Sequence, residues 1–325
     1  MNLRRSQWRS CAFLVLLFAL AACDQGRQRE GLIASAEEAK NEGRLRVAAD
    51  LYHKAVRLTP REFNTQYQVA LLDLQLENVH EAEEHLRTAI ALRPYFGPAH
   101  LNLGVALLRR GQKVEGRQAF LEALRVDPRL TRAYYNLGVL DLDDGRLKEA
   151  EELFKQAIAI DPSHQASYVR IGNLYVKQRQ FPAALNVLET AVALGPADSQ
   201  AFFNLGLAYE GLGRPAQSLA AFKKAIALNP SYTNAHYNLG TLLLKIGDYH
   251  GAIQPLSEAI QLDPSFSDAL YNLAAAYARL GEKETTVQWL KQAIQFNHAL
   301  ASEARRDDDF GSLHADPDFL AITRQ

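Results

Sequence analysis

Residues 134–162 read YYNLGVLDLDDGRLKEAEELFKQAIAIDP, and the same pattern of small, bulky and turn-forming residues recurs every 34 residues along the chain. The period is clearest in seven prolines: Pro60, Pro94, Pro128, Pro162, Pro196, Pro230 and Pro264. A fixed period of this length without insertions indicates an array in which each unit packs on its neighbours and not around one central core. We therefore predict eight repeats over residues 29–300.

Small residues mark where helices meet within each repeat. Positions in a repeat are numbered from its first residue. Position 27 is alanine in all eight repeats, from Ala55 to Ala293. Positions 8 and 20 are also small, and bulky apolar residues recur at positions 7 and 24, as Leu137 and Phe154 do in repeat 4. These spacings predict two amphipathic helices per repeat, at positions 1–14 and 17–30. Glycine at position 15 of most repeats ends the first helix, and proline at position 32 ends the second.

These residues resemble the consensus of the tetratricopeptide repeat family, to which the stretch over residues 134–162 is similar. The resemblance covers residues 29–300 and implies an all-α fold, a right-handed superhelical solenoid of antiparallel helix pairs. The sequence departs from the pattern at Ser35 in the first repeat, and at Thr286 and His298 in the last. Atypical terminal repeats are expected in a solenoid.

The first 22 residues have the organisation of an export signal, with Arg4, Arg5 and Arg9 before an apolar run over residues 11–22. That run is too short to span a bilayer, which takes about 20 residues. It ends in the sequence Leu20-Ala21-Ala22-Cys23, which resembles the bacterial lipoprotein box and implies cleavage before Cys23 and lipidation of that cysteine. The alternatives are an ordinary secretory signal or an uncleaved anchor.

The residues around the cleavage site also predict a location. Cys11 and Cys23 are the two cysteines of the chain, so the mature protein would retain one thiol and no disulfide. Asp24 resembles the signal that keeps enteric lipoproteins in the inner membrane, which predicts the periplasmic face of that membrane, with the outer membrane as the alternative. A linker over residues 23–28 would hold the array within about 20 Å of the lipid.

The segment over residues 301–325 follows the last repeat and is predicted to cap it. Asp316 is a suitable helix N-cap with Pro317 at the first helical position, and Phe319 and Leu320 would cover the apolar face of repeat 8. The alternative is a docking peptide for a partner.

No motif for catalysis, a cofactor or a metal stands out. The sequence lacks a glycine-rich phosphate loop, Gly-x-Ser-x-Gly, His-Glu-x-x-His and paired cysteines. His80 and His85 are the nearest histidine pair, and a spacing of five does not place both on one helical face. The formal charge is −1, or −4 without residues 1–22, and does not indicate nucleic-acid binding. We therefore predict a protein that is not an enzyme and holds neither cofactor nor metal.

The candidate binding residues are the polar side chains at position 6 of the first helices. This position faces away from position 8, which faces the partner helix. It carries Gln68, Asn102, Asn136, Arg170, Asn204, Asn238 and Asn272. An amide both donates and accepts hydrogen bonds, which suits a peptide backbone. In the family, first helices line the groove, and asparagine here resembles the residue that holds a bound peptide. The alternative is that "Asn-Leu-Gly" serves folding alone.

Neighbouring positions extend this predicted groove. Position 5 supplies aromatic residues such as Tyr67 and Tyr237. Position 13 supplies cations, broken by Asp143: Arg109, Lys177, Lys245 and Arg279. A groove lined by aromatic rings, amides and cations is suited to bind an extended peptide segment, with a weak preference for an acidic one.

The sequence therefore predicts an exported, lipid-anchored scaffold or assembly factor that binds another envelope protein in its concave groove. Two alternatives remain open at this point. The chain could be a regulatory subunit of a cell-wall hydrolase, protease or glycosyltransferase, or a structural homo-oligomer built through its end repeats.

Overall fold

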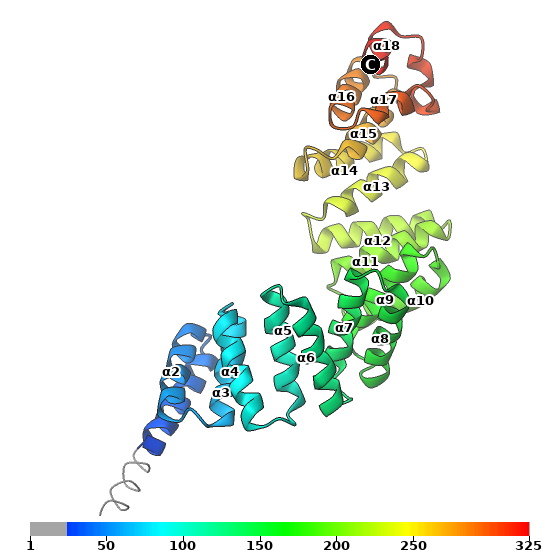
Figure 1. Cartoon of the computed structure of the whole chain (residues 1–325). Coiled ribbons are helices and arrows are strands. Elements are labelled where there is room, and N and C mark those ends of the chain that lie inside the picture. The colour runs from blue at the N-terminus through cyan, green and yellow to red at the C-terminus, as the bar shows by residue number, and fades with distance from the viewer. Residues whose placement is uncertain (1–24, 325) are drawn as a thin grey trace, which may run out of the picture. The chain divides into compact units, whose positions relative to one another are not determined.

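The computed structural model describes residues 25–324, whose regular secondary structure is helical throughout. Consecutive helices form antiparallel pairs (Figure 1). The chain divides into two compact units at Asp161 and Pro162, and each unit is described by itself. The predicted all-α architecture of repeated helix pairs is confirmed.

The N-terminal unit begins with a helix over residues 25–41, so helix already covers the end of the predicted linker. The following helices alternate between second and first helices of the repeats: α2 (Leu45–Leu58), α3 (Phe63–Gln75), α4 (Val79–Leu92), α5 (Gly97–Arg109), α6 (Lys113–Val126), α7 (Thr131–Asp143) and α8 (Leu147–Ile160).

The C-terminal unit continues the same alternation: α9 (Gln165–Lys177), α10 (Phe181–Leu194), α11 (Ser199–Gly211), α12 (Pro215–Leu228), α13 (Thr233–Lys245), α14 (Tyr249–Leu262), α15 (Ser267–Arg279) and α16 (Lys283–Phe296). Three short elements follow: α17 (Ala299–Ala304), the 3₁₀ helix η1 (Asp308–Leu313) and α18 (Pro317–Thr323). From α3 onward, first helices occupy positions 1–13 and second helices positions 17–30, against the predicted 1–14 and 17–30.

The turn between the helices of a pair is left-handed at position 15 in every repeat. Six repeats have glycine there, as at Gly145 with φ 75°. Glu77 (φ 64°) and Arg179 (φ 58°) hold the same conformation with a side chain. Glycine adopts this conformation without the steric cost that a Cβ atom brings, so these two turns are strained relative to the other six.

The core of each helix pair forms where a small residue at position 8 meets a large one at position 24. A Cβ atom added to Gly138 would lie 2.7 Å from the Phe154 ring, and one added to Gly206 would lie 2.5 Å from the Phe222 ring. Phe154 and Phe222 are fully buried, as are the alanines at position 27. Close-packed contacts of this kind leave no room for an added methyl group.

The C-terminal segment packs on the last repeat. Asp316 accepts hydrogen bonds from the backbone N–H groups of Asp318 and Phe319, with Pro317 at the start of α18. Phe310 and Phe319 are fully buried in a cluster that includes Leu290 of α16. The Lys283 ammonium lies 2.6 Å from the Asp316 carboxylate, so charge and apolar contacts both hold the segment in place.

Candidate functional site

The position 6 side chains of the N-terminal unit fall into two environments. Asn102 is buried, and its Nδ2 donates to the Tyr67 hydroxyl at 2.9 Å. Tyr67 packs against Phe63 and Phe96, and its burial raises its pKa. Asn136 is half-buried, and so is Gln68 at the same position of repeat 2. Asn102 therefore links two neighbouring first helices and is not offered to solvent as the sequence pattern suggests.

The C-terminal unit repeats this division. Asn204 is buried with 1% of its surface exposed, its Oδ1 accepts from Asn173 Nδ2 at 3.3 Å, and its own Nδ2 has no partner among the described residues. Asn238 and Asn272 are half-buried. Asn238 Nδ2 donates to the carbonyl of Asn234 at 2.7 Å, and Asn272 Nδ2 donates to Thr241 Oγ1 at 2.9 Å. The helix periodicity placed all of these amides on an outward face, but close packing of adjacent first helices covers two of them.

The cations at position 13 are exposed, and most have a partner in the fold. The Arg109 guanidinium donates to the Leu74 carbonyl at the end of α3, at 2.5 Å. Lys245 lies 3.3 Å from Glu210. Arg279 lies 3.6 Å from Asp309 and over the Tyr249 ring. These side chains therefore join neighbouring elements as well as facing solvent.

Two cationic residues of the predicted groove lie on α9. Lys177 is exposed at the end of this helix, and Arg170 is half-buried and engaged with neighbouring groups. Lys177 thus places an ammonium at the surface at this end of α9.

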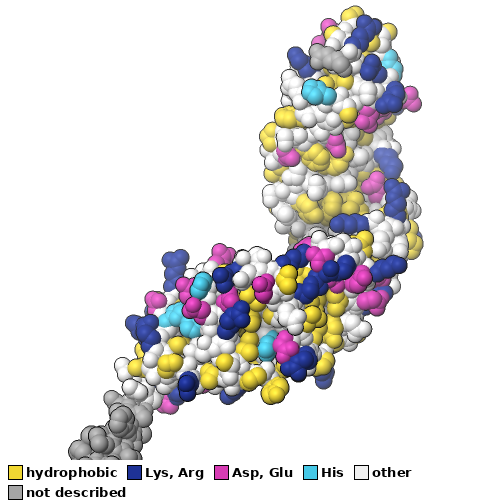
Figure 2. All heavy atoms as spheres, in the orientation of Figure 1, with side chains coloured by type: hydrophobic (Ala, Val, Ile, Leu, Met, Phe, Trp, Pro, Cys, Tyr) yellow, Lys and Arg dark blue, Asp and Glu magenta, His cyan; other side chains and the backbone are white. Residues whose placement is uncertain are grey.

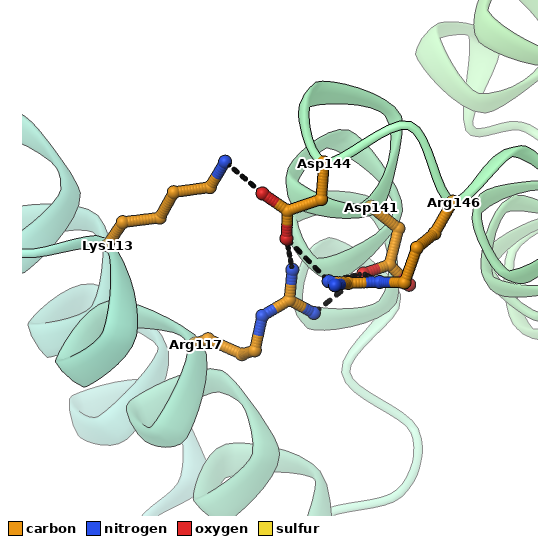
Figure 3. Close-up of polar contacts among 5 residues, drawn as sticks. All are labelled: Lys113, Arg117, Asp141, Asp144 and Arg146. Carbon is orange, nitrogen blue, oxygen red and sulfur yellow. Dashed lines mark hydrogen bonds and ion pairs between the residues drawn. The ribbon is translucent and has the colours of Figure 1, made fainter.

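An ion-pair network joins repeats 3 and 4 at the turn between α7 and α8 (Figure 3). Asp141 is buried, and its Oδ1 accepts from Arg117 at 2.7 Å and from Arg146 at 2.6 Å. Asp144 also contacts both arginines, and the Lys113 ammonium beside it lowers the pKa of its carboxyl. Charge-assisted hydrogen bonds therefore satisfy the buried aspartate.

A second buried aspartate lies in repeat 2 and has different neighbours. Asp73 is fully buried near the end of α3, with His53 of α2 at 3.2 Å. The ring of His85 on α4 lies 5.2 Å from that of His53, centroid to centroid. Burial lowers the pKa of His85, and the nearby His53 lowers it further. Figure 2 shows histidine side chains at the surface over α2 and α4.

This histidine and aspartate cluster was missed by the sequence reasoning, which compared histidines only along one helix. His80 and His85 are not part of one cluster, because His80 pairs with Glu84 at 3.6 Å. One feature of the sequence could have indicated a buried polar cluster. At position 11, Asp73 and Asp141 replace the apolar or aromatic residues of the other repeats.

On the face of the N-terminal unit that Figure 2 shows, cationic and acidic side chains are interspersed and form no patch of one sign. Charge on this face therefore selects neither an acidic nor a basic partner. Among residues 25–324, no helix has the length and apolar character needed to cross a membrane. Cys23 and the predicted signal segment lie outside the described residues.

Comparison with protein families identifies the repeat. A family model described as "Tetratricopeptide repeat" matches more than half of the chain, over residues 67–130, 101–164, 169–233, 203–265 and 237–304. The chain belongs to the tetratricopeptide repeat family. This fold is generally a scaffold for protein–protein interaction and not a catalytic one.

Among solved structures, this tetratricopeptide repeat chain is similar to YrrB, described as a TPR protein with an unusual peptide-binding site. The two are 26% identical, the match covers 59% of this chain and 100% of YrrB, and the TM-score is 0.52. PilF of Pseudomonas aeruginosa is 22% identical with a TM-score of 0.57, over 68% of this chain and 97% of PilF. The second likeness shows the fold alone.

Among curated proteins, the chain is similar to the protein O-mannosyl-transferase TMTC3 of Homo sapiens, at 31% identity over 74 residues. The TMTC3 of Mus musculus gives the same match. The matched stretch covers 22% of this chain and 8% of the human protein. A match this short, within a repeat fold, does not establish a transferase activity.

Proposed function

We propose that this tetratricopeptide repeat protein is a lipid-anchored scaffold of the bacterial cell envelope, which binds an extended polypeptide segment along its first helices. Family membership supports the scaffold, since tetratricopeptide arrays bind protein partners. The peptide-binding site described for YrrB supports a peptide ligand. The arginines, apolar run and Leu20-Ala21-Ala22-Cys23 sequence support the anchor.

The observation that carries the binding proposal is the set of half-buried amides at position 6. Asn136, Asn238 and Asn272 recur at one position of the first helices, and none of them is sealed in the core. The hydrogen bond of Asn238 is to a carbonyl of its own helix, and that of Asn272 is to a threonine hydroxyl. The bond of Asn238 is local, and that of Asn272 joins α15 to α13, but both amides stay partly exposed. They can exchange these bonds for bonds to a peptide backbone, whose groups pair equally well with an amide.

The buried amides have a separate role in this proposal. Asn102 and Asn204 lie between first helices and contact Tyr67 and Asn173. Replacing either by alanine removes a buried hydrogen bond, so we expect it to lower stability more than binding. The five asparagines thus divide into three half-buried ones that stay accessible to a ligand and two buried ones that lie between first helices.

Peptides selected on the purified full chain from a display library of unstructured sequences provide the binding test. The Asn238→Ala, Asn272→Ala double variant should bind such a peptide about 5- to 150-fold more weakly. This range follows from roughly 0.5–1.5 kcal/mol for each hydrogen bond lost. Helix content should not fall, because alanine favours helix.

A matched control replaces exposed residues of second helices, Lys223 and Gln261, by alanine and should leave the affinity unchanged. Equal affinity of the double variant and the control would contradict binding through position 6.

The anchor has its own test. Cys23→Ser should abolish incorporation of labelled fatty acid and release the protein from membranes, because durable attachment needs two or more acyl chains. A native protein that takes up no labelled fatty acid would exclude lipidation and leave the groove proposal unaffected.

A further inference from the structure

Three side chains with metal-ligand chemistry converge from three helices of the N-terminal unit. His53 is on α2, Asp73 on α3 and His85 on α4, and one potential ligand atom of each lies within 4.8 Å of the other two. The three helices belong to repeats 1 and 2 and pack in sequence along the chain. Only the repeat packing brings the three residues together, because they lie 20 and 12 residues apart in the sequence.

Asp73 is the unusual member of this cluster. Its Oδ1 lies 3.2 Å from His53 Nε2 and 3.3 Å from Asn78 Nδ2. Its Oδ2 is buried and has no hydrogen-bond partner among the described residues. A carboxyl oxygen without a partner costs free energy in a protein interior, and a cation bound to Oδ2, or to both oxygens of the carboxylate, would remove that cost.

The second histidine is held with a lone pair available. Gln66 Nε2 donates to the Pro60 carbonyl at 2.7 Å, which fixes the amide so that its Oε1 faces His85 Nδ1, also at 2.7 Å. An amide oxygen can only accept, so His85 Nδ1 carries a hydrogen, and in the neutral ring Nε2 is the nitrogen with a free lone pair. Metal-ligating histidines characteristically donate their other ring N–H to an oxygen in this way.

We propose that His53, Asp73 and His85 form a binding site for one divalent transition-metal ion such as Zn²⁺. Two imidazoles and one carboxylate suit such an ion better than Mg²⁺ or Ca²⁺, which prefer oxygen ligands. Ligand atoms around a tetrahedral zinc ion with bonds of about 2.0–2.1 Å lie about 3.3 Å apart, close to the 3.2 Å between His53 Nε2 and Asp73 Oδ1.

His53 would bind the ion through Nε2 as the neutral tautomer that carries its hydrogen on Nδ1. A neutral ring protonated at Nε2 moves that hydrogen to Nδ1 by exchange with solvent, and a doubly protonated ring releases its Nε2 proton to solvent. The side chain of His53 is 26% exposed, so solvent reaches this side of the cluster and an ion can enter there. The ion would tie repeat 1 to repeat 2, because its ligands come from both.

The test is calorimetric titration of the full, untagged chain, stripped with a chelator, with ZnCl₂ and separately with MgCl₂. We expect one equivalent of Zn²⁺ to bind and no saturable binding of Mg²⁺. His53→Gln and His85→Gln should each weaken Zn²⁺ binding by more than about 100-fold, since even outer hydrogen-bond partners of metal ligands are worth about 10- to 100-fold. The control His80→Gln, on the exposed side of α4, should bind as the native chain does.

Binding of Co²⁺ to the native chain tests the site without any substitution, so this test does not depend on whether a variant folds. The native chain should give the intense visible absorption of a four- or five-coordinate cobalt ion, and Zn²⁺ should displace it. A weak octahedral spectrum, or equal Zn²⁺ affinity of the native chain and the His53→Gln variant, would overturn the site and leave a hydrogen-bonded cluster only.

Discussion

Repeats 2 and 4 each have a buried aspartate at position 11, Asp73 and Asp141. The two aspartates have different hydrogen-bond partners, and this difference determines whether the carboxylate is available to a metal ion. Asp141 receives hydrogen bonds from Arg146, at position 16 of its own repeat, and from Arg117 of the preceding second helix. Asp73 has Asn78 at position 16 of its own repeat, and from the preceding second helix it has His53 at position 25, whereas Arg117 is at position 21. Two arginines make Asp141 part of a structural ion-pair network, whereas both contacts of Asp73 are to its Oδ1, and its Oδ2 has no hydrogen-bond partner among the described residues.

The largest expected difference between the two repeats is their response to zinc. At a free Zn²⁺ concentration of about 100 times the dissociation constant, binding should raise the unfolding free energy of the N-terminal repeats by about 2.7 kcal/mol. Hydrogen exchange should show added protection in α2, α3 and α4 and none in α7. Equal protection of both regions would mean that zinc binds elsewhere or without specificity.

Replacing each aspartate by leucine, which repeats 3 and 7 carry at this position as Leu107 and Leu243, should have unequal effects on the metal-free chain. Asp141→Leu should lower the local unfolding free energy by about 2 kcal/mol, because two arginines lose charge-assisted hydrogen bonds. Asp73→Leu should be neutral or slightly stabilising, because it removes a poorly satisfied buried carboxyl. Urea titration followed by hydrogen exchange measures both, and equal losses would contradict the distinction.

An arginine introduced into repeat 2, at the position of Arg146 in repeat 4, tests whether the arginine causes the difference between the two aspartates. Asn78→Arg gives Asp73 an arginine partner at the position that Arg146 has beside Asp141. It should therefore stabilise the metal-free repeat by about 1 kcal/mol. The same change should abolish zinc binding, since the guanidinium would form an ion pair with the Asp73 carboxylate and repel the metal ion. Asn78→Gln is the matched control and should retain the metal. Undiminished zinc affinity of Asn78→Arg would exclude Asp73 as a ligand.

The smallest expected effect concerns the turn next to these aspartates. Repeat 2 has Glu77 at φ 64°, and repeat 4 has Gly145 at φ 75°. Glu77→Gly should stabilise its repeat by about 0.5–1 kcal/mol, and Gly145→Glu should destabilise its repeat by about 1 kcal/mol, because a side chain is strained in the left-handed conformation. Thermal unfolding of the two variants measures this, and shifts of the same sign would contradict it.

The sequence predicted the features that depend on one repeat and its period. The 34-residue spacing and the small residues at positions 8 and 27 determine both helices and their contacts, so the bounds of α2 to α16 agree with the prediction to within one residue. The first helix begins four residues before its predicted start. Features that depend on side chains from two repeats were not predictable in this way. The periodicity could not distinguish the buried Asn204 from the half-buried Asn238, and it did not bring His53, Asp73 and His85 together.

The central functional claim is that first helices bind an extended segment, and site-specific photo-crosslinking in intact membranes tests it most directly. A photoreactive residue is placed at Asn238 or Asn272, 34 residues apart on α13 and α15, with Lys223 and Gln261 on second helices as controls. We predict that the two first-helix positions capture neighbouring residues of one partner segment and that the controls capture none of it. Capture of the same segment from the second-helix positions, or of unrelated residues from the two first-helix positions, would contradict the claim.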